Sequence, residues 1–189
     1  MRRIIRAFDH FLSHVYGVTS FNNDPECILR IRLWHAAHAI HLPDLKVARG
    51  APVLELHLWN DHLTPMPEAG PDPAWSIQFW HRLTSSARAL ARLVAQDPQL
   101  SSAQAVGGAT VLFEQGEGTA TNRLARRIGF SVFPYHNPLG RFGLFWENFY
   151  TWWLMWAYNA ASVRHRRLLR IQRSEVWMSM DEFLRRYAK

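Results

Sequence analysis

An uncharged, tryptophan-rich stretch in the last third of the chain limits its folding options most sharply. No residue from 148 to 163 carries a charge, and four tryptophans lie in or beside this stretch: Trp146, Trp152, Trp153 and Trp156. A membrane-spanning helix needs about 20 predominantly apolar residues, so the stretch is short for a full span. We expect a helix over 142–170 that is either buried in a core or embedded at a membrane surface.

Basic residues follow the aromatic stretch directly: Arg164, Arg166, Arg167 and Arg170. Indole rings prefer the headgroup region of a bilayer to its hydrocarbon centre. A basic residue near an anionic surface adds about 1 kcal/mol of attraction. The pattern therefore favours the membrane-surface alternative, with the four tryptophans and these four arginines as contact residues.

Residues 1–16 predict an amphipathic basic helix. Its apolar residues recur at helical spacing and share one broad face: Ile4, Ile5, Phe8, Phe11, Leu12 and Val15. Asp9 interrupts the apolar run, and no small-residue cleavage site follows, so a signal peptide is not expected. The helix either docks on its own core or lies on an anionic membrane.

Composition sets the class of protein and of partner. The chain has 189 residues, 48% of them hydrophobic and 20% charged, which suits a single domain over 1–189 and excludes wholesale disorder. Its one cysteine, Cys27, excludes a disulfide framework. The net charge of +7 is carried almost entirely by arginine and predicts a polyanionic partner. Because no zinc-finger, RRM or KH motif is present, we expect an acidic lipid or phosphorylated ligand rather than nucleic acid.

Alternating patterns predict two half-buried strands, over 28–34 and 53–59. In the first, leucine and isoleucine face one way and two arginines the other. In the second, Leu54, Leu56 and Leu58 face the core, and Glu55 and His57 lie opposite.

Helical patterns alternate with strand patterns further along the chain. Asp72 and Pro73 predict the start of a helix that runs to about Gln96, with Arg82, Arg88 and Arg92 facing away from its apolar stripe. A strand over 106–113, a short helix over 119–128 and a strand over 130–133 follow. This order predicts an α/β or α+β fold, with a single mixed β-sheet, flanking helices and the long Trp-rich C-terminal helix.

Polar residues cluster where the second strand ends: Glu55, His57, Asn60, Asp61 and His62. A histidine beside a carboxylate is suited to general base chemistry, so we predict His57 as base, Glu55 or Asp61 as its orienting group and Asn60 as hydrogen-bond donor. The alternative is structural, with Glu55 paired to Arg30 or Arg32 across the sheet. The spacing of His57 and His62 fits no familiar metal-ligand pattern, so no metal site is predicted, and the cofactor stays open.

Two further stretches carry candidate ligand-binding residues. Gly116 and Gly118, followed by Thr119 and Arg123, offer backbone N–H groups to an anion at a helix start. Tyr135 and His136 leave the last predicted strand between two prolines. The alternatives are a capped turn for the first stretch and a rigid turn for the second.

Three segments together carry a family resemblance: 52–60, 124–134 and 177–183. The chain resembles the YkoP-like proteins, a small bacterial family sometimes found with polysaccharide deacetylases. The family's polar H-x-x-N pattern falls on His57 and Asn60. The resemblance implies an envelope-related role near the membrane and no established reaction.

The unit at 123–133, a helix that ends in Gly-Phe before a strand, is similar to the late part of GNAT-type acyltransferases. That resemblance implies acyl transfer, but the glycine-rich loop that would bind acyl-CoA pyrophosphate is missing after the 53–59 strand.

Together these patterns predict a peripheral protein on the cytoplasmic face of the membrane. Two functions stay open. One is an accessory or ligand-binding protein of envelope lipid or polysaccharide metabolism. The other is a transferase that acts on an acyl or lipid substrate with His57 as base.

Overall fold

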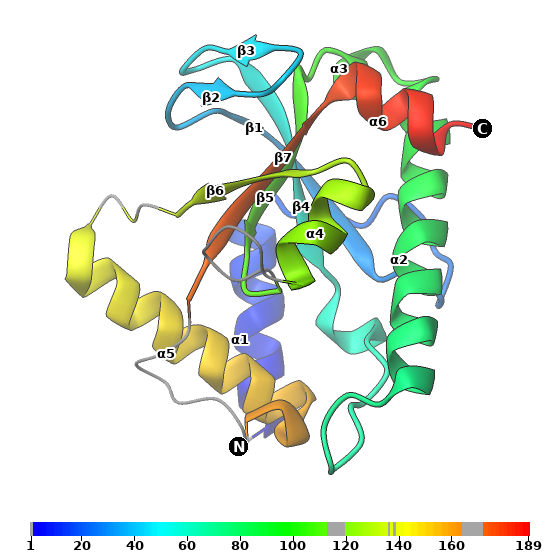
Figure 1. Ribbon diagram of the computed structural model, residues 1–189. Coiled ribbons are helices and arrows are strands. Elements are labelled where there is room, and N and C mark those ends of the chain that lie inside the picture. Colours follow the sequence, from blue (N-terminus) through cyan, green and yellow to red (C-terminus); the bar gives the residue numbers. More distant parts are fainter. Residues whose placement is uncertain (1, 113–119, 136, 138, 164–171) are drawn as a thin grey trace.

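A mixed five-stranded sheet forms the centre of the protein (Figure 1). The computed structural model describes residues 2–112, 120–135, 137, 139–163 and 172–189. The sheet has the order β1-β4-β5-β7-β6, with β1 (Leu29–His35), β4 (Pro52–Leu58), β5 (Ala105–Thr110), β6 (Ser131–Pro134) and β7 (Ser174–Ser179). β4 and β5 run parallel, and the other neighbouring pairs run antiparallel. The predicted mixed sheet with flanking helices is confirmed.

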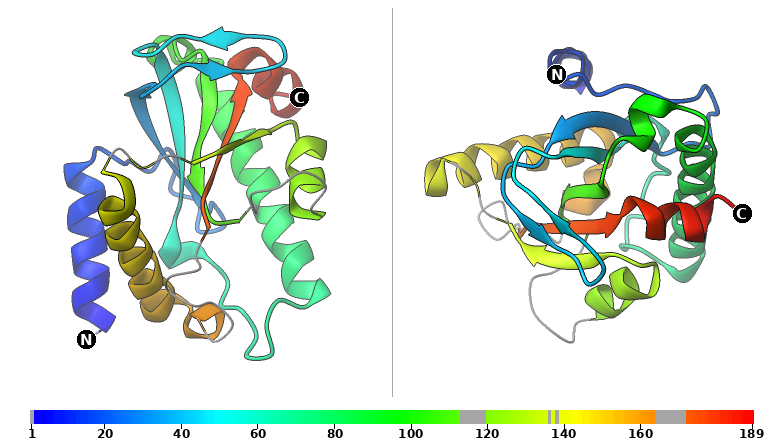
Figure 2. Two further views of the ribbon diagram at one scale, coloured as in Figure 1. Left: turned by 60° about the vertical axis from the view of Figure 1, so that its left-hand side comes forward. Right: turned by 90° about the horizontal axis from the view of Figure 1, so that it is seen from above.

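Helices cover both faces of the sheet (Figure 2). They are α1 (Arg2–Val15), α2 (Pro73–Val94), α3 (Pro98–Ser101), α4 (Ala120–Arg127), α5 (Gly140–Tyr158) and α6 (Met180–Tyr187), with short 3-10 turns η1 (Asn60–His62) and η2 (Ala160–Val163). α2, α4 and α6 lie on one side. α1 and α5 lie side by side on the other. The small hairpin of β2 (Ile40–His41) and β3 (Lys46–Val47) packs against Val53 and Trp177 at the opposite end of the sheet from these two helices.

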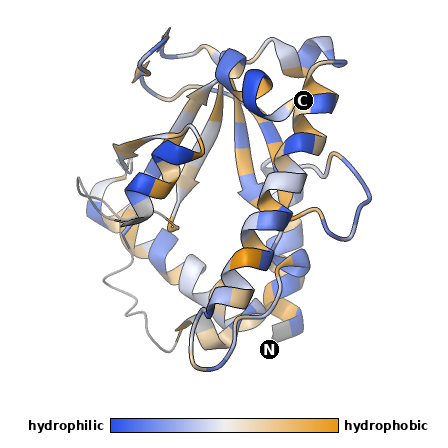
Figure 3. Cartoon of the chain, turned by 45° about the vertical axis from the view of Figure 1, so that its right-hand side comes forward, coloured by the Kyte–Doolittle hydropathy of each residue, from blue (hydrophilic) through white to orange (hydrophobic). Residues whose placement is uncertain are grey.

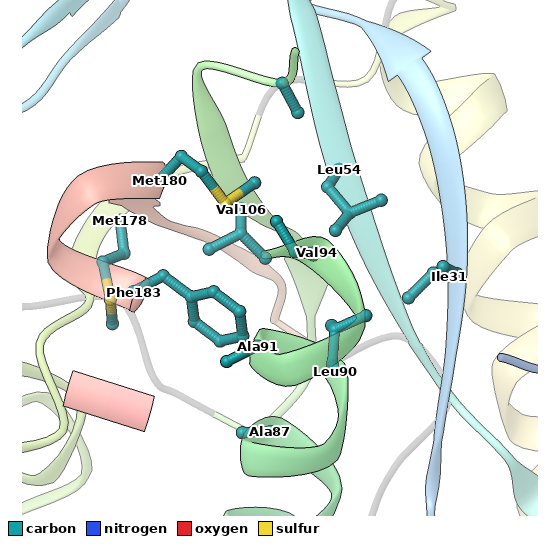
Figure 4. Close-up of a cluster of buried hydrophobic side chains, with 11 residues drawn as sticks. Ile31, Leu54, Ala87, Leu90, Ala91, Val94, Val106, Met178, Met180 and Phe183 are labelled. Carbon is teal, nitrogen blue, oxygen red and sulfur yellow. The ribbon is translucent and has the colours of Figure 1, made fainter. Parts of the chain in front are cut away.

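The main hydrophobic core lies between the sheet and α2 (Figure 4). Leu90 and Val94 of α2 are fully buried there against Leu54 of β4 and Val106 of β5, and Phe183 of α6 closes the cluster. Burying a side chain of this size stabilises the fold by about 1.5–3 kcal/mol. β1 and β4 contribute side chains to this core because apolar and polar residues alternate along them (Figure 3).

The start of α2 follows the predicted capping chemistry. The Asp72 carboxylate accepts a hydrogen bond from the Trp75 backbone N–H at 2.7 Å, and Pro73 occupies the first turn. The prediction that Arg82 faces away is wrong, because its side chain is buried. Its guanidinium donates to the Pro25 carbonyl at 2.9 Å and lies 2.9 Å from a Glu26 carboxylate oxygen.

The aromatic helix is shorter than predicted. α5 ends at Tyr158, where the expectation was a helix over 142–170, and η2 follows it. The chain then returns as β7, a central strand buried along its whole length, and closes with α6. No alternating pattern in the sequence predicts β7. A strand covered on both faces lacks the alternation that reveals a half-buried one.

The parallel strands β4 and β5 separate after three residue pairs. Pairing runs from Val53 with Ala105 to Glu55 with Gly107. Beyond that point residues 56–58 stay paired with β1, and residues 108–110 stay paired with β7. The sheet therefore splits toward η1, and the two strands run apart in Figure 1.

Candidate functional site

The side chains of Glu55 and His57 lie on the sheet face that α1 and α5 cover. Leu54 and Leu56 lie on the opposite face, as the alternation predicts. Antiparallel pairing places Arg32 opposite Glu55 and Arg30 opposite His57. Two arginines, a glutamate and a histidine thus share one patch of the sheet.

Glu55 is shared between two cationic partners. Its Oε2 lies 3.5 Å from Arg32 Nη1 and 3.7 Å from His57 Nε2. The first contact confirms the structural alternative of a cross-strand ion pair. The second is too long for a hydrogen bond. Among the described residues, buried His57 Nε2 has no hydrogen-bond partner.

The three residues of η1 divide between two roles. Asn60 lines the same cavity as His57. Asp61 instead lies 3.0 Å from His10 Nε2 on α1. His62 Nδ1 lies 2.8 Å from the Cys27 carbonyl oxygen, and its ring stacks on a neighbouring tryptophan. Asn60 and His57 therefore line one cavity, whereas Asp61 and His62 hold η1 against α1 and against the Cys27 backbone.

A buried carboxylate joins α1 to α5 beside this patch. Asp9, which is 5% exposed, accepts hydrogen bonds from Tyr150 at 2.8 Å and from Tyr158 at 3.1 Å. Arg30 Nη2 lies 4.0 Å from the same carboxylate. Burial, together with the Asp9 charge, raises the pKa of both tyrosine hydroxyls.

Tyr135 belongs to a second polar network at the start of α5. Its hydroxyl donates to Glu147 Oε1 at 2.7 Å, and burial with this carboxylate raises the Tyr135 pKa. Arg173 approaches Glu147 as well, with its Nε 3.7 Å from Oε2, and it donates to Asn148 and Thr151. Burial lowers the pKa of Arg173. This network supports the rigid-turn alternative for Tyr135.

A cavity of about 530 Å³ connects these groups. Arg30, His57, Asn60 and Arg173 line it, and it reaches through the split between β4 and β5 to the α2 side of the sheet. Its volume falls in the range of about 300–1,000 Å³ that is typical of small-molecule sites.

The predicted membrane tryptophans are not equally accessible. Trp146 is 52% exposed, whereas Trp152, Trp153 and Trp156 are half-buried. Large apolar side chains are exposed elsewhere on the same two helices. They are Ile4, Phe8, Phe11 and Val15 on α1, and Phe142, Phe145 and Trp146 on α5.

Several predicted residues lie outside the described residues: Gly116, Gly118, Thr119, His136, Arg164, Arg166, Arg167 and Arg170. Arg123 is described and is exposed on α4. Within the described part of the chain, no helix is long and apolar enough to cross a membrane. There, too, no three His, Cys, Asp or Glu side chains are placed to hold a metal ion.

Sequence reasoning missed the residues that complete the polar patch: Asp9, Arg30, Tyr150 and Arg173. Asp9 carries a signal, because it is the one carboxylate among residues 2–15 and lies at position i+4 from Ile5, on the same side of the helix. Tyr150 and Arg173 carry none, since their partners are distant in sequence.

Comparison with known proteins supports the family resemblance. The sequence profile of the YkoP domain matches residues 1–187. No curated protein and no solved structure matches the chain. Because the match spans nearly the whole chain, the protein belongs to the YkoP family.

Proposed function

We propose that the protein is a peripheral membrane protein on the cytoplasmic face, where it serves as an accessory or ligand-binding protein of envelope lipid or polysaccharide metabolism. The observation that carries this proposal is the orientation of α1. Ile4, Phe8 and Phe11 face outward, whereas Ile5 and Asp9 face inward. A helix that only docks on its own core would bury more of its large apolar residues than this one does.

The second supporting feature is the start of α5. Phe142, Phe145 and Trp146 are exposed there, and exposed Arg141 stands beside them. Exposed Arg3 accompanies the outer stripe of α1. Apolar rings with adjacent guanidinium groups suit the boundary between anionic headgroups and acyl chains. The membrane-surface proposal therefore rests on α1 and the first turns of α5, rather than on the middle of α5.

Vesicle co-sedimentation tests the proposal with a matched pair of variants. Ile4 on α1 and Ile77 on α2 are 69% and 71% exposed, so Ile4→Asp and Ile77→Asp remove similar apolar surface and add the same charge. We expect wild type and Ile77→Asp to pellet with phosphatidylglycerol vesicles at low salt. Ile4→Asp should bind about tenfold more weakly.

Salt and lipid charge provide the controls. Binding should weaken at high salt and with phosphatidylcholine vesicles, because the electrostatic part is screened or absent. Wild-type protein that stays in the supernatant with anionic vesicles at low salt would refute attachment. An equal loss of vesicle binding in Ile4→Asp and Ile77→Asp would refute α1 as the membrane-contacting helix.

A transferase role is the second candidate, and the unpartnered His57 Nε2 favours it. The nitrogen has no hydrogen-bond partner among the described residues and its side chain lines the cavity, where it is available to accept a proton. Residues 59–67 hold η1 and a loop, so the glycine-rich CoA loop is absent here too. Thiol release from acetyl-CoA that His57→Gln abolishes at unchanged thermal stability would support this role. Equal release by both proteins would exclude His57 as base.

A further inference from the structure

The cavity has two chemically different halves. On the α2 side its walls are apolar, with Leu58, Leu83, Leu112 and Phe130 among them. On the α1 and α5 side charged and polar groups join Leu12, Val18 and Leu154 in the walls. Three arginines line it there, Arg30, Arg32 and Arg173, together with one aspartate, Asp9. A molecule that fills both halves must have an apolar part and a polar part.

The split between β4 and β5 joins the two halves. Ile31 exchanges backbone hydrogen bonds with Thr19, so its pairing with Leu56 is of the non-hydrogen-bonded type. The N–H and C=O groups of Leu56 and Leu58 therefore point toward β5. The parallel pairing of Glu55 with Gly107 uses the Leu56 N–H, so the Leu56 C=O and the N–H and C=O of Leu58 are the groups that face the opening. Backbone groups that face a cavity need a partner from water or from a ligand.

The polar half contains buried nitrogen atoms that have no hydrogen-bond partner among the described residues. Arg30 is 8% exposed, and its buried Nε has no hydrogen-bond partner among the described residues. His57 Nε2 is in the same condition. Unsatisfied buried polar atoms are costly and are rare in folded proteins. Both side chains line the cavity, so a ligand in its polar half would lie beside them.

We propose that this cavity binds a single-chain amphiphile with an anionic carboxylate or phosphate head. The head lies at Arg30 and His57, and the chain passes through the split into the apolar half beside Leu83. An anionic head fits at Arg30, because its carboxylate neighbour Asp9 lies 4.0 Å away and its buried Nε has no partner among the described residues, whereas Arg32 and Arg173 approach Glu55 and Glu147. The inference rests on the ligand-binding part of the proposed function, and it is independent of membrane attachment.

A fluorescence titration tests it without any membrane. The probe is 11-(dansylamino)undecanoate below its micelle concentration, with dodecanoate, dodecyl phosphate and dodecyl maltoside as competitors. We expect saturable binding, displacement by either anionic competitor, and about tenfold weaker displacement by the neutral maltoside. Dodecanoate and dodecyl phosphate distinguish a carboxylate from a phosphate head. Absence of saturable binding would overturn the site, and equal displacement by all three would overturn the anionic head.

Two neighbouring residues of α2 supply matched variants. Thr84 lines the cavity, whereas Ser85 is exposed. Thr84→Phe should fill the apolar half and weaken binding of the probe at least about tenfold, while Ser85→Phe should leave it unchanged. Equal affinities in the two variants would overturn the placement of the chain.

A photoreactive diazirine fatty acid tests the placement on wild-type protein, so the result does not depend on how a variant folds. Mapped labels should fall on cavity residues of α2 and β5. Labels confined to the outer stripe of α1 would show surface adsorption only and would overturn the site. Failure of vesicle binding with normal probe binding would refute the membrane proposal and leave the cavity site intact.

Discussion

The carboxylate of Asp9 on α1 accepts a hydrogen bond from the hydroxyl of Tyr150 on α5, at 2.8 Å, across 141 positions of the sequence. Tyr158 donates to the other oxygen of the same carboxylate. The buried face of α1 is thus held by a polar contact, which leaves the apolar residues Phe8 and Phe11 partly or largely in solvent. Together with buried Ile5 and the pair between His10 and Asp61, this contact orients the helix on which the membrane proposal depends.

Replacing Asp9 by alanine should release α1 from α5. Two hydrogen bonds to a buried carboxylate are lost, and Arg30 loses its nearest charge, so we expect the free energy of unfolding to fall by about 2–4 kcal/mol. Amide hydrogen exchange should quicken in α1 more than in α2. Tyr150→Phe removes one donor only and should cost about 1 kcal/mol. Unchanged exchange in α1 would show that other contacts hold the helix.

The same contact predicts a loss of stability in alkali. Burial and the Asp9 charge raise the pKa of Tyr150 and Tyr158 above the ordinary value of 10.0, so the folded state retains protons that the unfolded state releases. The stabilisation is therefore complete below pH 10 and is lost as the pH rises above it. Urea denaturation at increasing pH measures this loss.

The phenylalanine variants provide the control for the alkaline prediction. Stability of the double variant Tyr150→Phe/Tyr158→Phe should depend less on pH above 10 than that of wild type, because two titrating groups are gone. Identical slopes in the two proteins would assign the alkaline loss to other groups.

Strand alternation and helix capping depend on residues that are close in sequence, and these parts of the fold were predicted correctly. Apolar and polar residues alternate along β1 and β4 as expected, and Asp72 caps α2 as its position before Pro73 indicates. Arg82 shows where such rules fail. Its place on the helix predicts exposure, but its guanidinium is buried because it bonds the carbonyl of Pro25 and pairs with the carboxylate of Glu26. Neither partner can be inferred from the spacing within α2.

The candidate site was predicted only in part, because only some of its residues are close in sequence. Glu55 and His57 share a face because strand residues two positions apart do so. Asp61 follows closely in sequence, yet it turns to His10 on α1. The groups that complete the polar patch, Asp9 and Arg173, come from opposite ends of the chain. Only the tertiary fold brings them to the split between β4 and β5.

Glu182 on α6 gives a prediction for acid conditions. Hydrogen bonds from Arg185 and Arg186 hold its pKa below the ordinary value of 4.5, so its carboxylate stabilises the folded state above that pH. The contribution is lost as the pH falls through the lowered pKa. Glu182→Gln should therefore destabilise the protein at pH 7 by a few tenths of a kcal/mol to about 1 kcal/mol, and less at pH 3.

Asp181→Asn is the matched control, because this exposed carboxylate lies in the same first turn of α6. It shares the interaction with the helix dipole but not the pairs with Arg185 and Arg186. Thermal melts of both variants at pH 7 and pH 3 measure the difference. Equal pH dependence in the two would show that the arginine pairs contribute nothing measurable.

Gly107 should be the least replaceable glycine of the sheet. A β-carbon there would collide with the Val176 carbonyl and lie 2.8 Å from Trp177 Cε3, because the indole crosses the strand at this point. The indole is held in place, since its Nε1 donates to Glu175 at 3.0 Å. Gly107→Ala must therefore move a central strand, and we expect it to lower the free energy of unfolding by at least about 3 kcal/mol.

Gly50→Ala is the control. At Gly50 a β-carbon meets no atom within 4 Å, so this substitution should cost only the roughly 1–2 kcal/mol of its positive φ. Urea denaturation of the two variants measures the difference, and equal costs would mean that Trp177 can leave Gly107 without penalty.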